Sequence, residues 1–295
     1  MMKRPNFMCI GAPKCGTTTL YDILKQHPDV YVPSFKEPNF FNLDENYNKG
    51  FSWYLSEFFS AVNNESVIGD FTPTYFVTVH SPRRIFKELG GDLKLVLLLR
   101  NPVDRAYSQY LHAKRDLDDD LPFVEALEAE NERVKQLTHV NPVLCNKLSY
   151  IQNSLYYSKL ENWLKYFNIK NIKIIIFEEE FLTNREGMIS DLFDFLEIPA
   201  CDLKLDISSN VAAVTRFKFL KALLREKTFI HLLAQKHMPH EFRQLIKNKL
   251  MALTNKTKRA EVIDGKTKKE ILNNYFIEDI EALEKLIARD LSVWK

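Results

Sequence analysis

A short apolar strand that runs directly into a compact, glycine-containing loop and then a helix is the feature that most constrains this chain. Phe7–Ile10 forms the apolar run, Gly11–Gly16 forms the loop, and the helical spacing of apolar residues begins at Leu20. Such a loop directs several backbone N–H groups and the positive end of the helix dipole at one place. Lys14 adds a full positive charge there, and the hydroxyls of Thr17–Thr19 add donors. The segment therefore predicts an anion site of the phosphate-binding kind.

The order of residues in this loop differs from that of a nucleoside triphosphatase. The Walker A pattern GxxxxGK[ST] has its lysine directly after the second glycine, whereas here Lys14 precedes Gly16 and no Lys-Ser or Lys-Thr pair follows it. This difference disfavours a nucleoside triphosphatase. Considered alone, the loop is also compatible with an ordinary capped helix start, so other motifs have to decide between the two.

Two further apolar runs, Leu95–Leu99 and Ile172–Phe177, are continuous rather than alternating, which is typical of strands buried on both faces of a parallel sheet. Helical stretches lie around them, at Pro82–Leu89, Val103–Arg115, Pro122–Leu137 and Leu155–Tyr166. Strands that alternate with helices predict an α/β fold, with a P-loop-like central parallel sheet flanked by helices. The charged segment Arg115–Pro122 is expected to be a solvated surface loop.

Past Pro199 the chain becomes helical and basic. The segments are Arg216–Gln235, Glu241–Lys258 and a closing helix over Lys266–Arg289, and we expect most of their basic residues to form a solvated face. Neither an internal repeat nor a low-complexity tract interrupts the sequence. The prediction is therefore a single domain over residues 1–295 with a helical C-terminal part.

Composition excludes several classes of protein. With 45% hydrophobic and 12% aromatic residues, the chain can bury a sizeable core and is not disordered. Its 41 Lys and Arg nearly balance its 39 Asp and Glu, and a net charge of +2 disfavours a nucleic-acid partner. No apolar run is long enough to cross a bilayer and we recognise no signal peptide, so no integral membrane association is expected.

The cysteines and histidines give no sign of a metal centre. Cys9, Cys15, Cys145 and Cys201 contain no CxxC pair, so neither a zinc cage nor a disulfide framework is expected, and a reducing, cytoplasmic location is favoured. The sequence also has no HExxH, no DxDxDG and no Cys/His cluster. We therefore expect no metal.

Two motifs together resemble one family. Pro13–Thr18 is similar to the 5′-phosphosulfate loop of sulfotransferases that use 3′-phosphoadenosine 5′-phosphosulfate (PAPS). The family's second signature is an Arg that ends a strand and a Ser eight residues later, which grip the 3′-phosphate; Arg100 and Ser108 match it. An Arg at the carboxyl end of a central strand also lies where open α/β sheets place ligands, and its guanidinium can hold a phosphate with two hydrogen bonds.

The resemblance implies PAPS as sulfuryl donor and 3′,5′-adenosine bisphosphate (PAP) as product, without a metal. The residues implied in cofactor binding are Lys14, Cys15, Gly16, Thr17, Thr18, Thr19, Arg100 and Ser108, with Lys258 and Arg259 as a weak match to a late cofactor loop. Lys14 would also neutralise charge on the leaving phosphate. Asp104 and Arg105 are interpreted as a local ion pair and a surface charge.

Other segments are similar to the heparan sulfate and related carbohydrate sulfotransferases. They are Lys36–Phe41, Gly50–Tyr54, Asp70–Phe76, Ser154–Tyr156, Asn162–Leu164 and the closing Asp290–Trp294. An acceptor hydroxyl needs a base to take its proton, and the resemblance makes Glu37 that base. It also implies a carbohydrate or glycolipid acceptor, bound at its hydroxyl or at an amine, with Asp70, Tyr75 and Phe40 as candidate acceptor-binding residues.

One departure from the family pattern concerns position 71. The carbohydrate enzymes often have a Lys after the acid that aligns with Asp70, where this chain has Phe71, so an auxiliary cation or acceptor contact is missing there. Three alternatives stay open: a tyrosyl-protein or small-alcohol sulfotransferase, a P-loop kinase of a small metabolite, and an adenosine-phosphate binding module without turnover. Acceptor identity and oligomeric state are not predicted.

Overall fold

The computed structural model describes residues 3–207, 214–215, 255–256 and 263–295. Contacts divide the chain into two compact units: unit 1 comprises Met1–Arg105, Gln152–Asn210 and Lys269–Lys295, and unit 2 comprises Ala106–Ile151 and Val211–Lys268. Both units are discontinuous in sequence. A single domain over residues 1–295 therefore stays a prediction.

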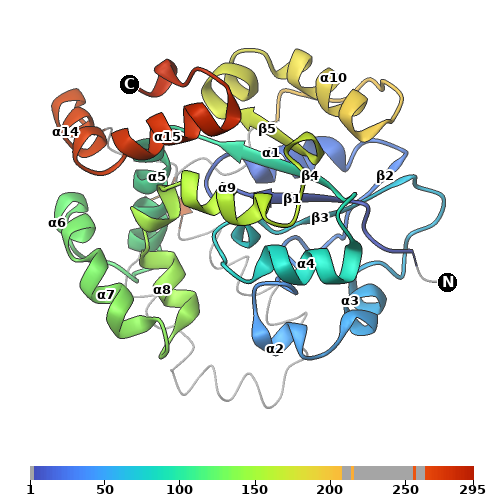
Figure 1. The fold of residues 1–295 in the computed structure, drawn as a ribbon, viewed down its shortest axis with the longest axis horizontal. Coiled ribbons are helices and arrows are strands. Elements are labelled where there is room, and N and C mark those ends of the chain that lie inside the picture. Colours follow the sequence, from blue (N-terminus) through green and yellow to red (C-terminus); the bar gives the residue numbers. More distant parts are fainter. Residues whose placement is uncertain (1–2, 208–213, 216–254, 257–262) are drawn as a thin grey trace. The chain divides into compact units, whose positions relative to one another are not determined.

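A five-stranded parallel sheet forms the centre of unit 1. Its strands are β1 (Phe7–Gly11), β2 (Val30–Tyr31), β3 (Val67–Phe71), β4 (Lys94–Leu99) and β5 (Ile172–Ile176), in the order β2-β3-β1-β4-β5 (Figure 1). The central strand β1 pairs with β3 on one side and with β4 on the other, and all the pairings are parallel. The predicted α/β class with a parallel central sheet is confirmed. β2 and β3 are additional strands that the apolar pattern does not indicate.

Helices cover both faces of this sheet. They are α1 (Thr17–Leu24), α2 (Asp44–Tyr47), α3 (Phe51–Phe58), α4 (Ser81–Leu89), α9 (Tyr157–Leu164), α10 (Arg185–Leu196) and α15 (Ile277–Ile287). Parallel strands are joined by right-handed crossovers, which put α1 on one face of the sheet and α4 and α9 on the other (Figure 1). Short helical turns complete the unit: η1 (Pro73–Tyr75), η2 (Gln152–Ser154), η3 (Ile169–Asn171), η4 (Phe177–Leu182) and η5 (Ser292–Trp294).

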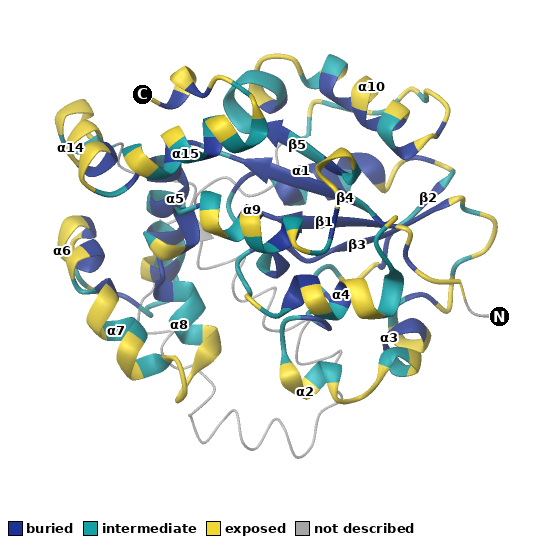
Figure 2. Ribbon diagram, in the orientation of Figure 1, coloured by how far each residue is buried: buried dark blue, intermediate teal, exposed yellow. Residues whose placement is uncertain are grey.

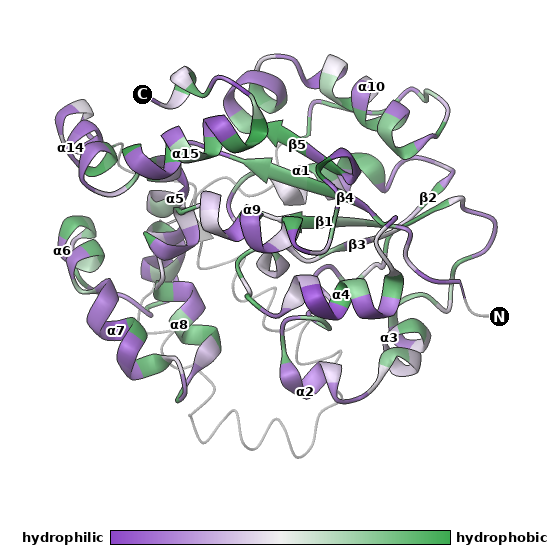
Figure 3. Cartoon of the chain, in the orientation of Figure 1, coloured by the Kyte–Doolittle hydropathy of each residue, from purple (hydrophilic) through white to green (hydrophobic). Residues whose placement is uncertain are grey.

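The core of unit 1 is the sheet itself. Every residue of β1 and β3 is buried, and so are Leu95–Leu99 of β4, so these strands are dark blue in Figure 2. Most of β4 is also green in Figure 3, because its residues are hydrophobic. Each fully buried leucine contributes about 1.5–3 kcal/mol relative to an exposed one. The continuous apolar runs predicted from the sequence are thus buried strands of this sheet. The loops that carry the candidate site begin where β1 and β4 end.

Among its described residues, unit 2 contains the helices α6 (Phe123–Glu128), α7 (Glu130–Leu137) and α8 (Pro142–Leu148), and an antiparallel pair, β6 (Val214–Thr215) with β7 (Asn255–Lys256). Helix α5 (Pro102–Arg115) begins in unit 1 and continues into unit 2, and α14 (Gly265–Tyr275) begins in unit 2 and ends in unit 1. None of the helices in the described part of the chain is both long and apolar enough to span a membrane.

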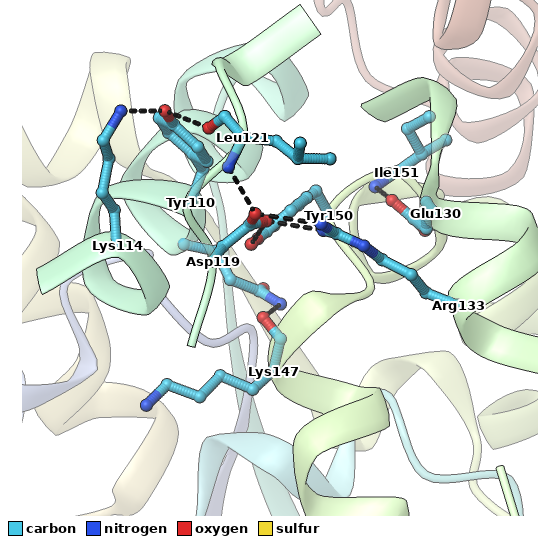
Figure 4. A network of polar contacts seen from close by, with 10 residues as sticks. Tyr110, Lys114, Asp119, Leu121, Glu130, Arg133, Lys147, Tyr150 and Ile151 are labelled. Atoms are coloured by element: carbon cyan, nitrogen blue, oxygen red, sulfur yellow. Dashed lines mark hydrogen bonds and ion pairs between the residues drawn. The ribbon is translucent and has the colours of Figure 1, made fainter. Parts of the chain in front are cut away.

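A buried carboxylate organises the loop at the end of α5 (Figure 4). Asp119 accepts two hydrogen bonds from Arg133, at 2.6 and 3.0 Å, one from the Tyr150 hydroxyl at 2.7 Å and one from the Leu121 N–H at 3.1 Å. The expectation of a solvated loop over Arg115–Pro122 is thus wrong at Asp119, which faces inward because four donors surround it.

Two predicted helices are each split in the structure. The stretch Pro122–Leu137 divides at Ala129, and the break brings Glu130 inward to accept from the Ile151 N–H at 2.7 Å. The closing helix divides at Phe276, which leaves the helical region (φ −127°) and buries its ring. At each break one side chain, Glu130 or Phe276, is buried.

Candidate active site

The phosphate loop lies between β1 and α1 and is shaped by two left-handed residues. Lys14 has φ 72° and Gly16 has φ 92°, and the Ala12 N–H donates to the Leu98 carbonyl at 2.8 Å, which ties the loop to β4. Gly16 is the N-cap of α1 and offers no side-chain cap to the first turn. The first N–H groups of a helix have no partner within it, so this turn can receive an anion.

Close packing explains why Gly16 is a glycine. A Cβ on this residue would lie 2.9 Å from Cε2 of Phe177 and 3.2 Å from Cε1 of Phe181, and its φ lies in the region that side chains disfavour. The rings of Phe177 and Phe181 stack on each other, with centroids 5.3 Å apart. η4 therefore forms one wall of the loop.

Arg100 brings the second motif to this loop. It follows β4 directly, and its Nη1 donates to the Lys14 carbonyl at 3.3 Å while its guanidinium lies 5.1 Å from the centroid of the Phe177 ring. The Tyr156 hydroxyl donates to the Arg100 carbonyl at 2.9 Å. The Arg100 guanidinium is half-buried, and its planar arrangement of N–H donors suits phosphate binding.

Arg105 is a residue whose role the sequence interpretation missed. The expectation of a surface charge is wrong, because the side chain is completely buried; its Nε donates to Ser154 Oγ at 2.6 Å and its Nη1 to the Pro13 carbonyl at 3.4 Å. A buried guanidinium must be hydrogen-bonded to be tolerated. Arg105 therefore holds the phosphate loop in place through the Pro13 carbonyl. The sequence feature that could have indicated this role is the match of Ser154–Tyr156 to the family segment, because Ser154 is the partner of Arg105.

Lys36 and Glu37 lie in the loop after β2, and Lys36 reaches the start of α1. Lys36 Nζ donates to Thr18 Oγ1 at 2.7 Å and lies 4.0 Å from Glu37 Oε1. The Glu37 N–H donates to the Phe71 carbonyl at 3.2 Å, which fixes this segment to the end of β3, and Glu37 is left-handed with φ 65°. The Lys36 side chain is 17% exposed and that of Glu37 is 41% exposed. Burial lowers the pKa of Lys36, although the nearby Glu37 carboxylate opposes this shift.

Asp70, Tyr75 and Phe40 are interior residues, with no more than a trace of exposed surface. Asp70 accepts hydrogen bonds from Tyr54 at 2.6 Å, Thr72 at 2.6 Å and Tyr75 at 3.0 Å, and the Tyr75 hydroxyl in turn accepts from the Phe40 N–H at 3.2 Å. A direct contact of these three side chains with an acceptor does not agree with this burial. They hold the segment that carries Glu37 instead.

Burial shifts the titration of two acidic groups in the site. It raises the pKa of Asp70 to about 6, although three hydroxyl donors oppose the shift. Burial also raises the pKa of the Cys15 thiol to about 11, while the nearby Arg105 and Arg100 lower it. Because the Cys15 side chain is fully buried, only its backbone can serve the loop.

The end of the chain packs against the start of α5. The Asn101 side chain donates to the Trp294 carbonyl at 3.0 Å, and the Trp294 indole donates to Glu178 at 2.8 Å. Glu178 also accepts from the Asn101 N–H at 2.9 Å. This triangle fixes the turn between Arg100 and α5.

The remaining predicted site residues are less informative. Ser108 is half-buried on α5 within unit 2, so its joint action with Arg100 stays a prediction. Lys258 and Arg259 lie outside the described residues. Within the described ranges, no group of three His, Cys, Asp or Glu side chains could hold a metal ion.

Comparisons with known proteins identify the family of this chain. The sequence matches the sulfotransferase domain family over residues 4–258, and the chain belongs to that family. The crystal structure of a sulfotransferase from Alicyclobacillus acidocaldarius superposes with a TM-score of 0.69 at 28% sequence identity, over 99% of both chains.

Curated relatives of the chain include heparan sulfate sulfotransferases. The chain is 32% identical to the heparan sulfate glucosamine 3-O-sulfotransferase 3B1 of Homo sapiens over 194 residues, which are 65% of this chain and 46% of that protein. It is also 32% identical to the human heparan sulfate glucosamine 3-O-sulfotransferase 5 over 176 residues, 58% of this chain and 47% of that protein. The chain thus spans about half the length of the curated relatives it matches.

Proposed function

We propose that this protein transfers a sulfuryl group from PAPS to a hydroxyl, or to an amine, of a carbohydrate or glycolipid. The observation that carries the proposal is the convergence of Arg100, the loop around Lys14 and, through Lys36, the Glu37 carboxylate at one edge of the sheet. The names of the heparan sulfate relatives support a carbohydrate acceptor.

The loop fits the donor because its anion-binding turn is uncapped and a planar guanidinium lies beside it. PAPS supplies a sulfuryl group on a phosphate leaving group. In this proposal the first turn of α1 and Lys14 bind the 5′-phosphate and offset the charge that develops on it, and Arg100 with Ser108 binds the 3′-phosphate. The anion is held by donors that are already in place before binding, which favours catalysis by positioning.

Glu37 is the base of the proposed reaction. Its carboxylate is partly exposed and its backbone is tied to β3, so it can meet an acceptor hydroxyl without losing its orientation. A positioned base contributes about 10²–10⁴-fold to such a step. The proton of the acceptor passes to Glu37 as the acceptor oxygen bonds to sulfur.

Radiolabelled transfer from PAPS tests this function, with heparan sulfate, a tyrosine peptide and a small alcohol as acceptor probes. We expect label in heparan sulfate, lost about 10²-fold or more in Glu37→Gln and retained in the matched variant Glu57→Gln, whose side chain is exposed on α3. Label in the peptide or the alcohol instead would replace the carbohydrate assignment. PAP binding without transfer to any probe would favour a binding module.

A further inference from the structure

The proposed function gives no role to Lys36, although its ammonium lies inside the candidate site. It belongs neither to the phosphate loop nor to the base, yet its ammonium lies against both, 2.7 Å from the Thr18 hydroxyl and 4.0 Å from the Glu37 carboxylate. Withdrawing a lysine from water is costly, so a lysine that is 17% exposed needs compensating partners. One neutral hydroxyl and one carboxylate at 4.0 Å leave room for a further anionic partner, since an ammonium has three donors.

The place of this ammonium matches the path of the transferred group. In an in-line displacement the leaving phosphate lies on one side of the sulfur and the acceptor oxygen on the other. In the proposed function, the first turn of α1, which contains Thr18, receives the phosphate, and Glu37 meets the acceptor hydroxyl. A cation that lies near both residues would then lie beside the sulfuryl group as it moves between them.

Phe71 supplies no charge at this point. Its ring is buried against Phe7 and Tyr21, with centroids 5.5 and 5.4 Å away, while its carbonyl holds the Glu37 N–H. The family's lysine after the acid is thus absent at the end of β3 in this chain. Lys36, in the segment after β2, supplies a positive charge instead.

We propose that Lys36 binds the sulfuryl oxygens of PAPS during transfer. The bond between sulfur and the phosphate oxygen breaks with its electron pair left on the phosphate, the acceptor oxygen bonds to sulfur, and the acceptor proton goes to Glu37. Lys36 stays protonated throughout and offsets the charge on the sulfuryl oxygens. This inference rests on the proposed function of the same site.

Binding of PAPS and of PAP to Lys36→Met, measured by calorimetry in EDTA without an acceptor, tests the proposal. PAP has no sulfuryl group, so we expect the affinity for PAPS to fall about 10-fold or more while that for PAP changes by less than about threefold. Lys36→Arg keeps the charge and should recover part of the PAPS affinity. Lys25→Met, an exposed lysine at the other end of α1, should bind both compounds as the wild type does.

The outcomes separate this inference from the function on which it depends. Wild-type protein that binds neither compound would overturn the proposed function itself. Wild-type binding of both, with Lys36→Met unchanged or with both affinities reduced equally, would overturn only the role of Lys36. Thermal unfolding of each variant shows whether the fold is retained. If Lys36→Met does not fold, Lys36→Arg decides: a change in PAPS affinity alone supports the role, and equal or absent changes for both compounds overturn it.

Discussion

The guanidinium of Arg100 donates to the backbone carbonyl of Lys14 at 3.3 Å, across 86 residues of sequence. The contact exists because β1 and β4 are neighbouring parallel strands, so the segments that follow them leave the sheet at the same edge. It brings together, at one edge of the sheet, the two motifs to which we assign the anion-binding site in our proposal. Changes on either side of this contact should therefore affect the same ligand.

Gly16→Ala should reduce both stability and PAP binding. The new methyl group would meet Phe177 at 2.9 Å in a left-handed backbone, which costs about 1–3 kcal/mol and displaces the loop. Gly50→Ala is the matched control, because Gly50 also has positive φ but has open space around its Cβ position. Urea unfolding should show a loss in both variants, while calorimetry should show weaker PAP binding only in Gly16→Ala. Equal PAP affinities would contradict a fixed loop shape.

Arg105→Met should unfold more readily than the wild type. Its loss leaves the Ser154 hydroxyl and the Pro13 carbonyl without their buried donor, at a cost of at least about 2 kcal/mol. Arg83→Met, at an exposed position on α4, should be nearly neutral. Chemical denaturation compares the two variants, and similar stabilities would show that Arg105 is dispensable to the loop.

We expect the carboxyl of Asp70 to make the free energy of unfolding fall as pH rises between about 4 and 6. Its pKa is about 6 in the folded protein against an ordinary value near 3.8, so the folded state binds its proton more tightly than the unfolded state in this window. The free energy of unfolding should decrease by up to about 3 kcal/mol across it. Unfolding at several pH values should show this decrease in the wild type and its absence in Asp70→Asn. A wild-type profile identical to that of the variant would mean that Asp70 titrates normally.

Asp119 should give the opposite pH dependence. Burial alone would raise its pKa, but the hydrogen bonds from Arg133, Tyr150 and the Leu121 N–H lower it below its ordinary value. Its contribution is therefore present above the ordinary aspartate pKa and is lost as pH falls through the lowered one.

Asp119→Asn should cost about 3–5 kcal/mol at neutral pH, because it leaves Arg133 without its anion. The adjacent, exposed Asp120→Asn serves as control and should change stability by less than about 0.5 kcal/mol. Denaturant unfolding of both variants measures the difference. Equal values would show that the network in Figure 4 adds nothing to stability.

Structural features that depend on residues close together in the sequence could be predicted, whereas features that depend on residues far apart in the sequence could not. The apolar runs that became β1, β4 and β5 are continuous, and the loop before α1 is local in sequence. The strand β3 contains Gly69 and Asp70, which disfavour strands in isolation and are tolerated because both sheet neighbours and the three hydroxyl donors are present.

Charged side chains were the main source of error. Arg105 and Asp119 are both interpreted from sequence as solvated, since charged residues are rarely buried without partners. Their partners lie 49 and 14 residues away, for Arg105 at Ser154 and for Asp119 at Arg133. Only the folded chain brings such partners together, and the same holds for the bridge from Lys36 to Thr18.

Calorimetric titration with PAP in EDTA is the most direct test of the central claim that this edge of the sheet is a sulfotransferase cofactor site. We expect metal-free binding with micromolar or tighter affinity, weakened about 10- to 150-fold in Arg100→Ala and unchanged in Arg83→Ala. Absence of PAP binding together with magnesium-dependent binding of ATP would contradict the account and favour a kinase.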